Sequence, residues 1–230
     1  MHNTPIIEKH DRFWVVRDDL VPGGTKQIVL RKMLPDLNET HFVYTASVFG
    51  KGGAALAFAC AELGYKCTLF IAKSNFQPDW LEEVKKTDTR IIWTDALPVV
   101  EIETMAWQYA LQNEAFCLPL GFSSEQFHTA LVEYAHKLPF QPKEIWCPIV
   151  SGTMAHALES AFPHAAFKGV SVVKHHDYKG FGEIFQAPEK FARGAAIPPP
   201  YPAWPYSDAK LWRFAKKHGV DDAVIWNSNA

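Results

Sequence analysis

The 230-residue sequence has no long uncharged apolar run and almost no net charge. Its longest apolar candidate, from Ala54 to Ala72, is interrupted by Glu62 and Lys66, so it falls short of the roughly 18 uninterrupted residues that a membrane span needs. The formal net charge of −2 argues against a surface that coats nucleic acid. With 48% hydrophobic and 21% charged residues, the composition is that of a globular protein and excludes disorder and fibrous repeats.

Cysteine is also scarce. The four cysteines, Cys60, Cys67, Cys117 and Cys147, show no CxxC spacing and lie inside apolar segments. This pattern predicts buried free thiols instead of disulfides or zinc ligands, and we expect no metal site. The N-terminal sequence MHNTPIIEKHDR has no apolar core of a secretion signal, so we expect a cytoplasmic protein without a membrane partner.

Short apolar segments alternate with longer helical patterns through most of the chain. We predict strands at 13–17, 41–45, 67–72, 90–93, 115–118, 144–150, 167–173 and 223–226, and helices that end near 34, 63, 86, 112, 137, 161 and 218. Capping residues support three of these helices, namely Thr25, Ser123 and Ser207. The alternation predicts an α/β fold with a mainly parallel sheet.

The alternation stops between residues 174 and 206, in a segment that contains the proline-rich run PPPYP at 198–202. We expect this segment to wrap the domain and close a site, with recognition by another protein as the alternative. Its start, His175-His176-Asp177-Tyr178, follows a predicted strand. Tyr178 is a candidate substrate contact, and a plain surface turn is the alternative.

Ligands in parallel α/β folds bind where strands lead into helices, so the turns there are the candidate sites. The first such turn is GGTK at 23–26. Lys26 shares a helical stripe with Leu30 and Met33, and both burial and the helix dipole would lower the pKa of its amine. A neutral amine can form an imine with an aldehyde. Alternatively, its stem packs while its ammonium reaches water.

Two further turns and the tail are candidate ligand contacts. The turn SVFGKGG at 47–53 offers backbone amides to a carboxylate or phosphate, or is simply a tight connection, and it matches neither GxGxxG nor a Walker A loop. The turn SGT at 151–153 resembles a phosphate cradle, or alternatively a helix capped by Ser151. The polar tail at 226–230 is suited to hydrogen-bonding a ring nitrogen, or is a frayed end.

The order of these features resembles the pyridoxal-phosphate enzymes of the tryptophan-synthase-β type, known as fold type II. The nearest branch is that of aminocyclopropane-carboxylate deaminase and D-cysteine desulfhydrase. The sequences RDDL at 17–20 and GGTK at 23–26 are similar to that branch's R-[DE]-D…G-G-N-K, and ALAF…LGYKCTL at 55–69 resembles its helix and strand after the substrate loop. The resemblance covers most of residues 12–173, in a shortened form.

This resemblance implies a two-lobed architecture with mainly parallel twisted sheets flanked by helices. The larger, cofactor-binding lobe would comprise 1–39 plus 140–230, and a smaller mobile lobe would comprise 40–139. Pyridoxal 5'-phosphate would lie between them, and a homodimer is the implied assembly.

The resemblance also implies residue roles. Lys26 would be the Schiff-base lysine and proton shuttle, and Lys26 and Ser47 are the implied catalytic residues. The cofactor phosphate would be held by Ser151, Gly152 and Thr153. The substrate carboxylate would be held by Ser47 and the amides of Gly50, Gly52 and Gly53. Ser228 would lie beside the pyridine nitrogen, where a hydroxyl in place of a carboxylate would leave that nitrogen largely unprotonated.

The chain departs from the family pattern at several positions. Lys51 stands where the family has an asparagine near the cofactor's 3-hydroxyl, so a second amine is expected in the cofactor site. Thr25 also replaces an asparagine, and Ile149 and Val150 replace glycines of the phosphate loop.

The function that follows is a pyridoxal-phosphate-dependent lyase or deaminase, which acts on a small amino acid by β-elimination, β-replacement or deamination. One alternative is a non-catalytic module that binds the cofactor or an anion on the same scaffold. Another is a nucleotide- or phosphosugar-binding α/β enzyme.

Overall fold

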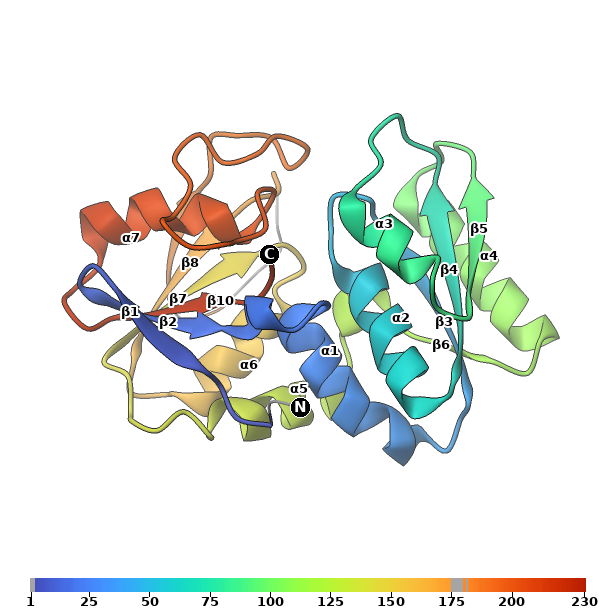
Figure 1. Ribbon diagram of the computed structural model, residues 1–230, viewed down its shortest axis with the longest axis horizontal. Coiled ribbons are helices and arrows are strands. Elements are labelled where there is room, and N and C mark those ends of the chain that lie inside the picture. Colours follow the sequence, from blue (N-terminus) through green and yellow to red (C-terminus); the bar gives the residue numbers. More distant parts are fainter. Residues whose placement is uncertain (1–2, 175–179, 181) are drawn as a thin grey trace.

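The computed structural model describes residues 3–174, 180 and 182–230, and it contains two sheets that stand side by side (Figure 1). The six-stranded sheet has the order β1-β2-β10-β7-β8-β9. Its strands are β1 (Ile7–His10), β2 (Phe13–Arg17), β7 (Glu144–Ile149), β8 (Ala166–Ser171), β9 (Glu183–Gln186) and β10 (Val224–Asn227). β1 runs antiparallel to β2, and the other pairs are parallel, so most strands end at the same edge.

The four-stranded sheet has the order β5-β4-β3-β6 and is parallel throughout. Its strands are β3 (His41–Ala46), β4 (Lys66–Ala72), β5 (Thr89–Thr94) and β6 (Phe116–Cys117). β4 is an apolar run because both of its faces are covered: Leu69 lies in the core with α2 (Gly52–Leu63), and Phe70 packs with α4 (Val99–Gln112).

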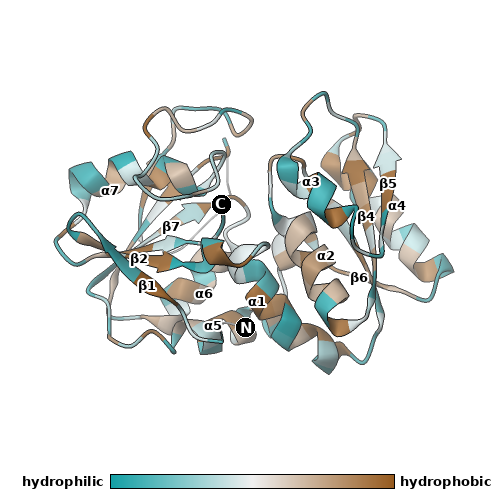
Figure 2. Cartoon of the chain, in the orientation of Figure 1, coloured by the Kyte–Doolittle hydropathy of each residue, from teal (hydrophilic) through white to brown (hydrophobic). Residues whose placement is uncertain are grey.

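Helix α1 (Gly24–Met33) lies between the two sheets and packs against α2 and α5 (Glu125–Ala135), while α5 also packs against α6 (Thr153–Ala161) (Figure 1). The remaining helices are α3 (Asp79–Val84) and α7 (Trp212–His218). Figure 2 shows that α2 is largely apolar, as expected for a helix placed between a sheet and another helix. The start of α1 is thereby held at the junction of the two sheets. The predicted lobe boundaries at 39 and 139 stay a prediction.

The predicted α/β architecture with parallel sheets flanked by helices is confirmed, and the four cysteines are buried and free, as expected. None of the helices in the described ranges is long and apolar enough to cross a bilayer.

Three predicted helix caps were wrong. The N-cap of α1 is Gly23, because Thr25 lies inside the helix and is fully buried. Ser124, and not Ser123, caps α5 by accepting from the amide of Phe127. Ser207 caps no α-helix: it precedes a 3₁₀ turn, Asp208–Leu211, before α7 begins.

Candidate active site

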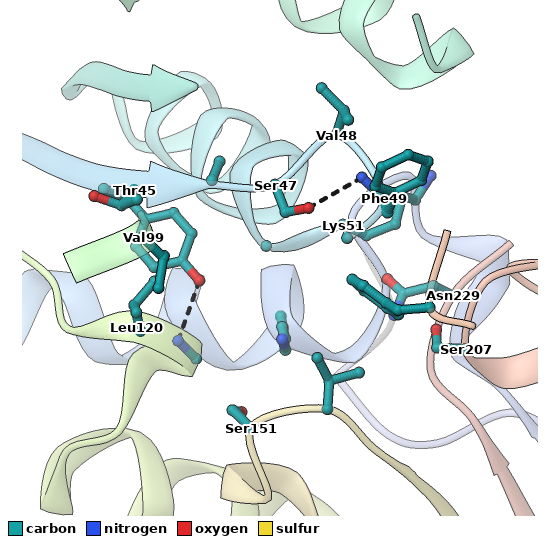
Figure 3. A pocket seen from close by; sticks show the side chains of 18 of the residues that line it. Thr45, Ser47, Val48, Phe49, Lys51, Val99, Leu120, Ser151, Ser207 and Asn229 are labelled. Carbon is teal, nitrogen blue, oxygen red and sulfur yellow. Dashed lines mark hydrogen bonds between the residues drawn. The ribbon is translucent and has the colours of Figure 1, made fainter. Parts of the chain in front are cut away.

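A cavity of about 540 Å³ lies where the ends of β3 and β7 face the start of α1 (Figure 3). Eight of the predicted site residues line it: Lys26, Ser47, Gly50, Lys51, Gly52, Ser151, Gly152 and Ser228. Gly53 and Thr153 are neighbours of lining residues but do not line the cavity themselves. Tyr178, with His175, His176 and Asp177, lies outside the described residues. The fold therefore brings the three turns and the tail, which are far apart in sequence, to one cavity.

Lys26 is in the first turn of α1, partly buried, with its amine 5.7 Å from the centre of the Phe122 ring. Burial lowers the pKa of this amine, and the opposing charge interactions with Asp208 and Cys147 are weaker. Within the part of the chain that the structure describes, the amine has no hydrogen bond and no ion pair. It is therefore available to a ligand in the cavity.

Gly24, two residues before Lys26, adopts a left-handed backbone with φ of +65° and touches the tail. A Cβ atom at this position would lie 1.8 Å from the Ser228 carbonyl oxygen, so only glycine allows this approach. The Thr25 amide donates to the same carbonyl at 3.0 Å. The start of α1 and the tail are thus joined directly.

The second turn is closed by its own hydrogen bonds. The Ser47 hydroxyl accepts from the Phe49 amide at 3.2 Å, and the Gly50 amide donates to the Ser47 carbonyl at 3.1 Å (Figure 3). The Gly50 amide is therefore engaged within the turn. Gly52 and Gly53 begin α2, where the first amides of a helix have no intrahelical acceptor and face outward. Of these two residues only Gly52 lines the cavity, so its amide is open to an anion there.

Lys51 is the N-cap of α2, and its amine lies 4.9 Å from the centre of the Trp204 ring. Burial lowers the pKa of this second amine, against weaker interactions with Asp208 and Asp79. Trp204 also donates from Nε1 to the Phe49 carbonyl at 2.7 Å. The segment that contains the proline-rich run thereby contacts the second turn, and its role in closing a site stays a prediction.

The third turn joins β7 to α6, whose N-cap is Gly152 and carries no side-chain cap. The capping alternative for Ser151 is therefore wrong; its hydroxyl lies 3.2 Å from the Thr153 hydroxyl. Gly121, at φ of +66°, approaches so closely that a Cβ atom would lie 2.3 Å from Ser151 Oγ. Two hydroxyls and the free first amides of α6 are thus gathered beside a glycine, an arrangement suited to an oxyanion.

The tail contacts a buried acid that the sequence reasoning missed. Asp208 lines the cavity and is 5% exposed. Its Oδ1 accepts from both the amide and the hydroxyl of Ser228, each at 2.7 Å, and its Oδ2 accepts from the Ser207 hydroxyl at 2.6 Å. Burial raises the pKa of this carboxyl. Its sequence context, next to a predicted cap, gives no sign of burial.

A second buried acid that the sequence does not predict is Asp18, which holds the start of α1 in place. It accepts from the Thr25 hydroxyl at 2.5 Å and from the Tyr134 hydroxyl at 2.6 Å. Trp226 of β10 donates to the same Thr25 hydroxyl at 3.1 Å. Burial raises the pKa of Asp18 to about 6. This network fixes α1 against β10, which leads into the tail.

The cavity combines a desolvated amine, an oxyanion cradle and a polar wall, which are the groups that an aldehyde-bearing, phosphorylated heteroaromatic cofactor requires. Two side-chain oxygens in its wall, Thr45 Oγ1 and Asn229 Oδ1, are buried without a partner among the described residues. A ligand in the cavity would give these two oxygens hydrogen-bond partners. The residues present therefore fit pyridoxal phosphate.

The chain belongs to the family of pyridoxal-phosphate dependent enzymes, whose sequence model matches residues 2–220. The predicted cofactor, pyridoxal 5'-phosphate, is thereby confirmed. The comparison with curated proteins gives no match.

Solved structures with the same fold confirm the predicted fold type II architecture. An ACC deaminase homologue has a TM-score of 0.75 at 14% identity, covering 94% of this chain and 84% of that chain. Threonine deaminase from T.th. has a TM-score of 0.73 at 12% identity, covering 99% and 92%. Diaminopropionate ammonia lyase from Escherichia coli has a TM-score of 0.69 at 13% identity, covering 94% and 77%.

Proposed function

We propose that this chain is a pyridoxal-phosphate-dependent enzyme that acts on a small amino acid by β-elimination, β-replacement or deamination, with Lys26 as the Schiff-base residue. The observation that carries the proposal is the amine of Lys26, which is desolvated, unpaired among the described residues and directed at a cavity that also holds an oxyanion cradle. The similar structures named above are two deaminases or deaminase homologues and an ammonia lyase, which supports this reaction class.

The cofactor would be held at three places. Ser151, Gly152 and Thr153, with the first amides of α6, would bind its phosphate. Lys26 would hold its aldehyde carbon, and Ser228 would lie at its ring nitrogen. When bound, pyridoxal phosphate supplies an electron sink for negative charge that develops at the substrate's α-carbon.

The substrate would be oriented by the second turn. The free amides of Gly52 and Gly53 at the positive end of α2 would bind its carboxylate, together with the Ser47 hydroxyl. With the cofactor and substrate bound, the Lys26 amine would move a proton at the substrate's α-carbon, a role that its lowered pKa supports. The cavity volume of about 540 Å³ accommodates the cofactor and a small amino acid.

Closure of the smaller lobe over the substrate and assembly as a homodimer are part of the same proposal. The contact of Trp204 with the Phe49 carbonyl supports closure, because it joins the second turn to the segment that contains the proline-rich run. Excluding water in this way would protect the reacting carbon.

A non-catalytic cofactor-binding module is the second candidate, and the specific observation that favours it is Lys51. A second amine with a lowered pKa lines the same cavity and could compete with Lys26 for the aldehyde. The nucleotide or phosphosugar alternative gains no support, because the matching family depends on pyridoxal phosphate.

Borohydride reduction of the chain in the presence of pyridoxal phosphate, followed by peptide mass mapping, tests the proposal. We expect the label on Lys26, an absorption band that Lys26→Ala abolishes, and an unchanged label in Lys51→Ala. Release of ammonia, sulfide or a keto acid from an amino-acid panel would separate the enzyme from the binding module. A label on Lys51, or no band in the wild type, would reject the role of Lys26.

A further inference from the structure

Asp208 is the only acid among the described residues that line the cavity, and the proposed reaction assigns it no role. It forms no ion pair within the described ranges. The groups that face it electrostatically are Lys26 of α1, Lys51 at the start of α2, Cys147 of β7 and Tyr201 of the proline-rich run. Burial raises the pKa of the Cys147 thiol and of the Tyr201 phenol, so both stay neutral at neutral pH. Burial raises the pKa of Asp208 as well, whereas the hydrogen bonds that it accepts from Ser207 and Ser228 lower it and stabilise its ionised form. In that form Asp208 is the one negative charge among the described residues that line the cavity.

The hydrogen bonds of Ser228 decide what its hydroxyl can offer a ligand. The Ser228 amide can only donate, so Asp208 Oδ1 acts as an acceptor there, and the Ser228 hydroxyl donates its single proton to the same oxygen at 2.7 Å. Asn229 Nδ2 donates to the Ser228 hydroxyl oxygen at 2.8 Å. One lone pair of that oxygen is left over. A ring nitrogen that meets Ser228 must therefore bring a proton of its own.

We propose that Asp208, acting through the Ser228 hydroxyl, is a positioning residue that keeps the ring nitrogen of the bound cofactor protonated. This inference rests on the proposed function, because it places that nitrogen at Ser228. A serine hydroxyl that is free to donate its proton favours an unprotonated ring nitrogen. Because the Ser228 hydroxyl donates to Asp208 instead, the protonated nitrogen is favoured here. The carboxylate fixes the direction of the serine proton, and its negative charge stabilises the pyridinium.

A protonated ring nitrogen is a stronger electron sink than a neutral one, because it can accept the electron pair from the substrate's α-carbon without developing negative charge. Asp208 would thus determine how strongly the site stabilises negative charge at the substrate's α-carbon. Asp208→Asn is a sharp probe, since the amide oxygen can still accept from the amide and hydroxyl of Ser228 while the negative charge is removed.

The test is nitrogen-15 NMR of pyridoxal phosphate labelled at the ring nitrogen and bound at neutral pH. We expect the pyridinium signal in the wild type and the neutral pyridine signal in Asp208→Asn. Ser207→Ala is the matched control, because Ser207 contacts the other oxygen of the same carboxylate, and we expect the wild-type signal there. A pyridine signal in the wild type, or a pyridinium signal in Asp208→Asn, would overturn the inference.

Ser228→Ala covers the case in which Asp208→Asn does not fold. It removes only the linking hydroxyl, so we expect the pyridine signal, and a retained pyridinium signal would also overturn the inference. Failure of the proposed function shows differently: the wild type would then bind no labelled cofactor, or would carry it on a lysine other than Lys26.

Discussion

Replacing Gly24 with alanine tests how the tail is fastened to α1. The new Cβ would lie 1.8 Å from the Ser228 carbonyl oxygen and 2.5 Å from Asn229 Oδ1, on a backbone with φ of +65°. Gly64 offers a matched control, because its φ is +70° and a Cβ atom there meets nothing within 4 Å. The two substitutions therefore share the backbone strain, and only Gly24→Ala must also move the tail.

The expected costs follow from these contacts. The left-handed backbone costs an alanine about 1–2 kcal/mol, which is the whole effect expected for Gly64→Ala. Gly24→Ala should in addition break the hydrogen bond between the Thr25 amide and the Ser228 carbonyl, worth about 0.5–1.5 kcal/mol, and displace the side chains beside it. We expect Gly24→Ala to be the more destabilising by at least about 1 kcal/mol, or roughly 2–4 °C in Tm for a chain of this size.

Chemical denaturation and thermal unfolding of both variants give the stability difference, and titration with pyridoxal phosphate gives the effect on the site. We expect Gly24→Ala to weaken cofactor binding, because Ser228 is displaced, and Gly64→Ala to leave it unchanged. Equal losses of stability in the two variants, or unchanged cofactor affinity in Gly24→Ala, would refute the packing of the tail against α1.

Two further predictions concern the cradle and the buried acid behind it. In Gly121→Ala, a Cβ atom 2.3 Å from Ser151 Oγ should distort the proposed phosphate site. The affinity for pyridoxal phosphate should therefore fall at least about tenfold, while the affinity for pyridoxal, which lacks the phosphate, is unchanged. Equal losses of affinity for both compounds would contradict the proposal that residues 151–153 bind the phosphate. For Asp18, the folded-state pKa of about 6 lies above its ordinary value of 3.8, so its contribution to stability is complete below about pH 4 and is lost as the pH rises to 6. In Asp18→Asn, the free energy of unfolding should vary by up to about 3 kcal/mol less across this pH range than in the wild type. Chemical denaturation at a series of pH values measures this difference, and an unchanged pH profile would contradict the prediction.

The strands β3 and β4 were predictable from the sequence, because both of their faces are buried and few polar residues interrupt their apolar runs. The strands β1 and β9 were missed because they lie at the two edges of their sheet. Their exposed residues Glu8, Lys9 and Glu183 interrupt the apolar pattern. Each of these edge strands pairs on one side only, β1 with β2 and β9 with β8, so neither needs the continuous apolar run of a strand that is covered on both sides.

The turns of the site could be predicted because glycine and hydroxyl residues mark a strand-to-helix connection locally. Asp18 and Asp208 could not, because an acid becomes buried only when distant segments cover it, and their partners Tyr134 and Ser228 lie 116 and 20 residues away. Helix caps failed for a related reason: Thr25 has the chemistry of a cap, but its hydroxyl is taken by Asp18.

The position of β10 between β2 and β7 has a consequence for biosynthesis. The strands β3 to β6 all lie within residues 41–117, so their sheet can assemble as soon as that stretch has left the ribosome. The other sheet has a gap at its centre until residues 224–227 are translated, because β2 pairs early with β1 but its second partner lies some two hundred positions downstream. We therefore expect a nascent chain to gain its ability to capture the cofactor only after residues 224–227 have been translated.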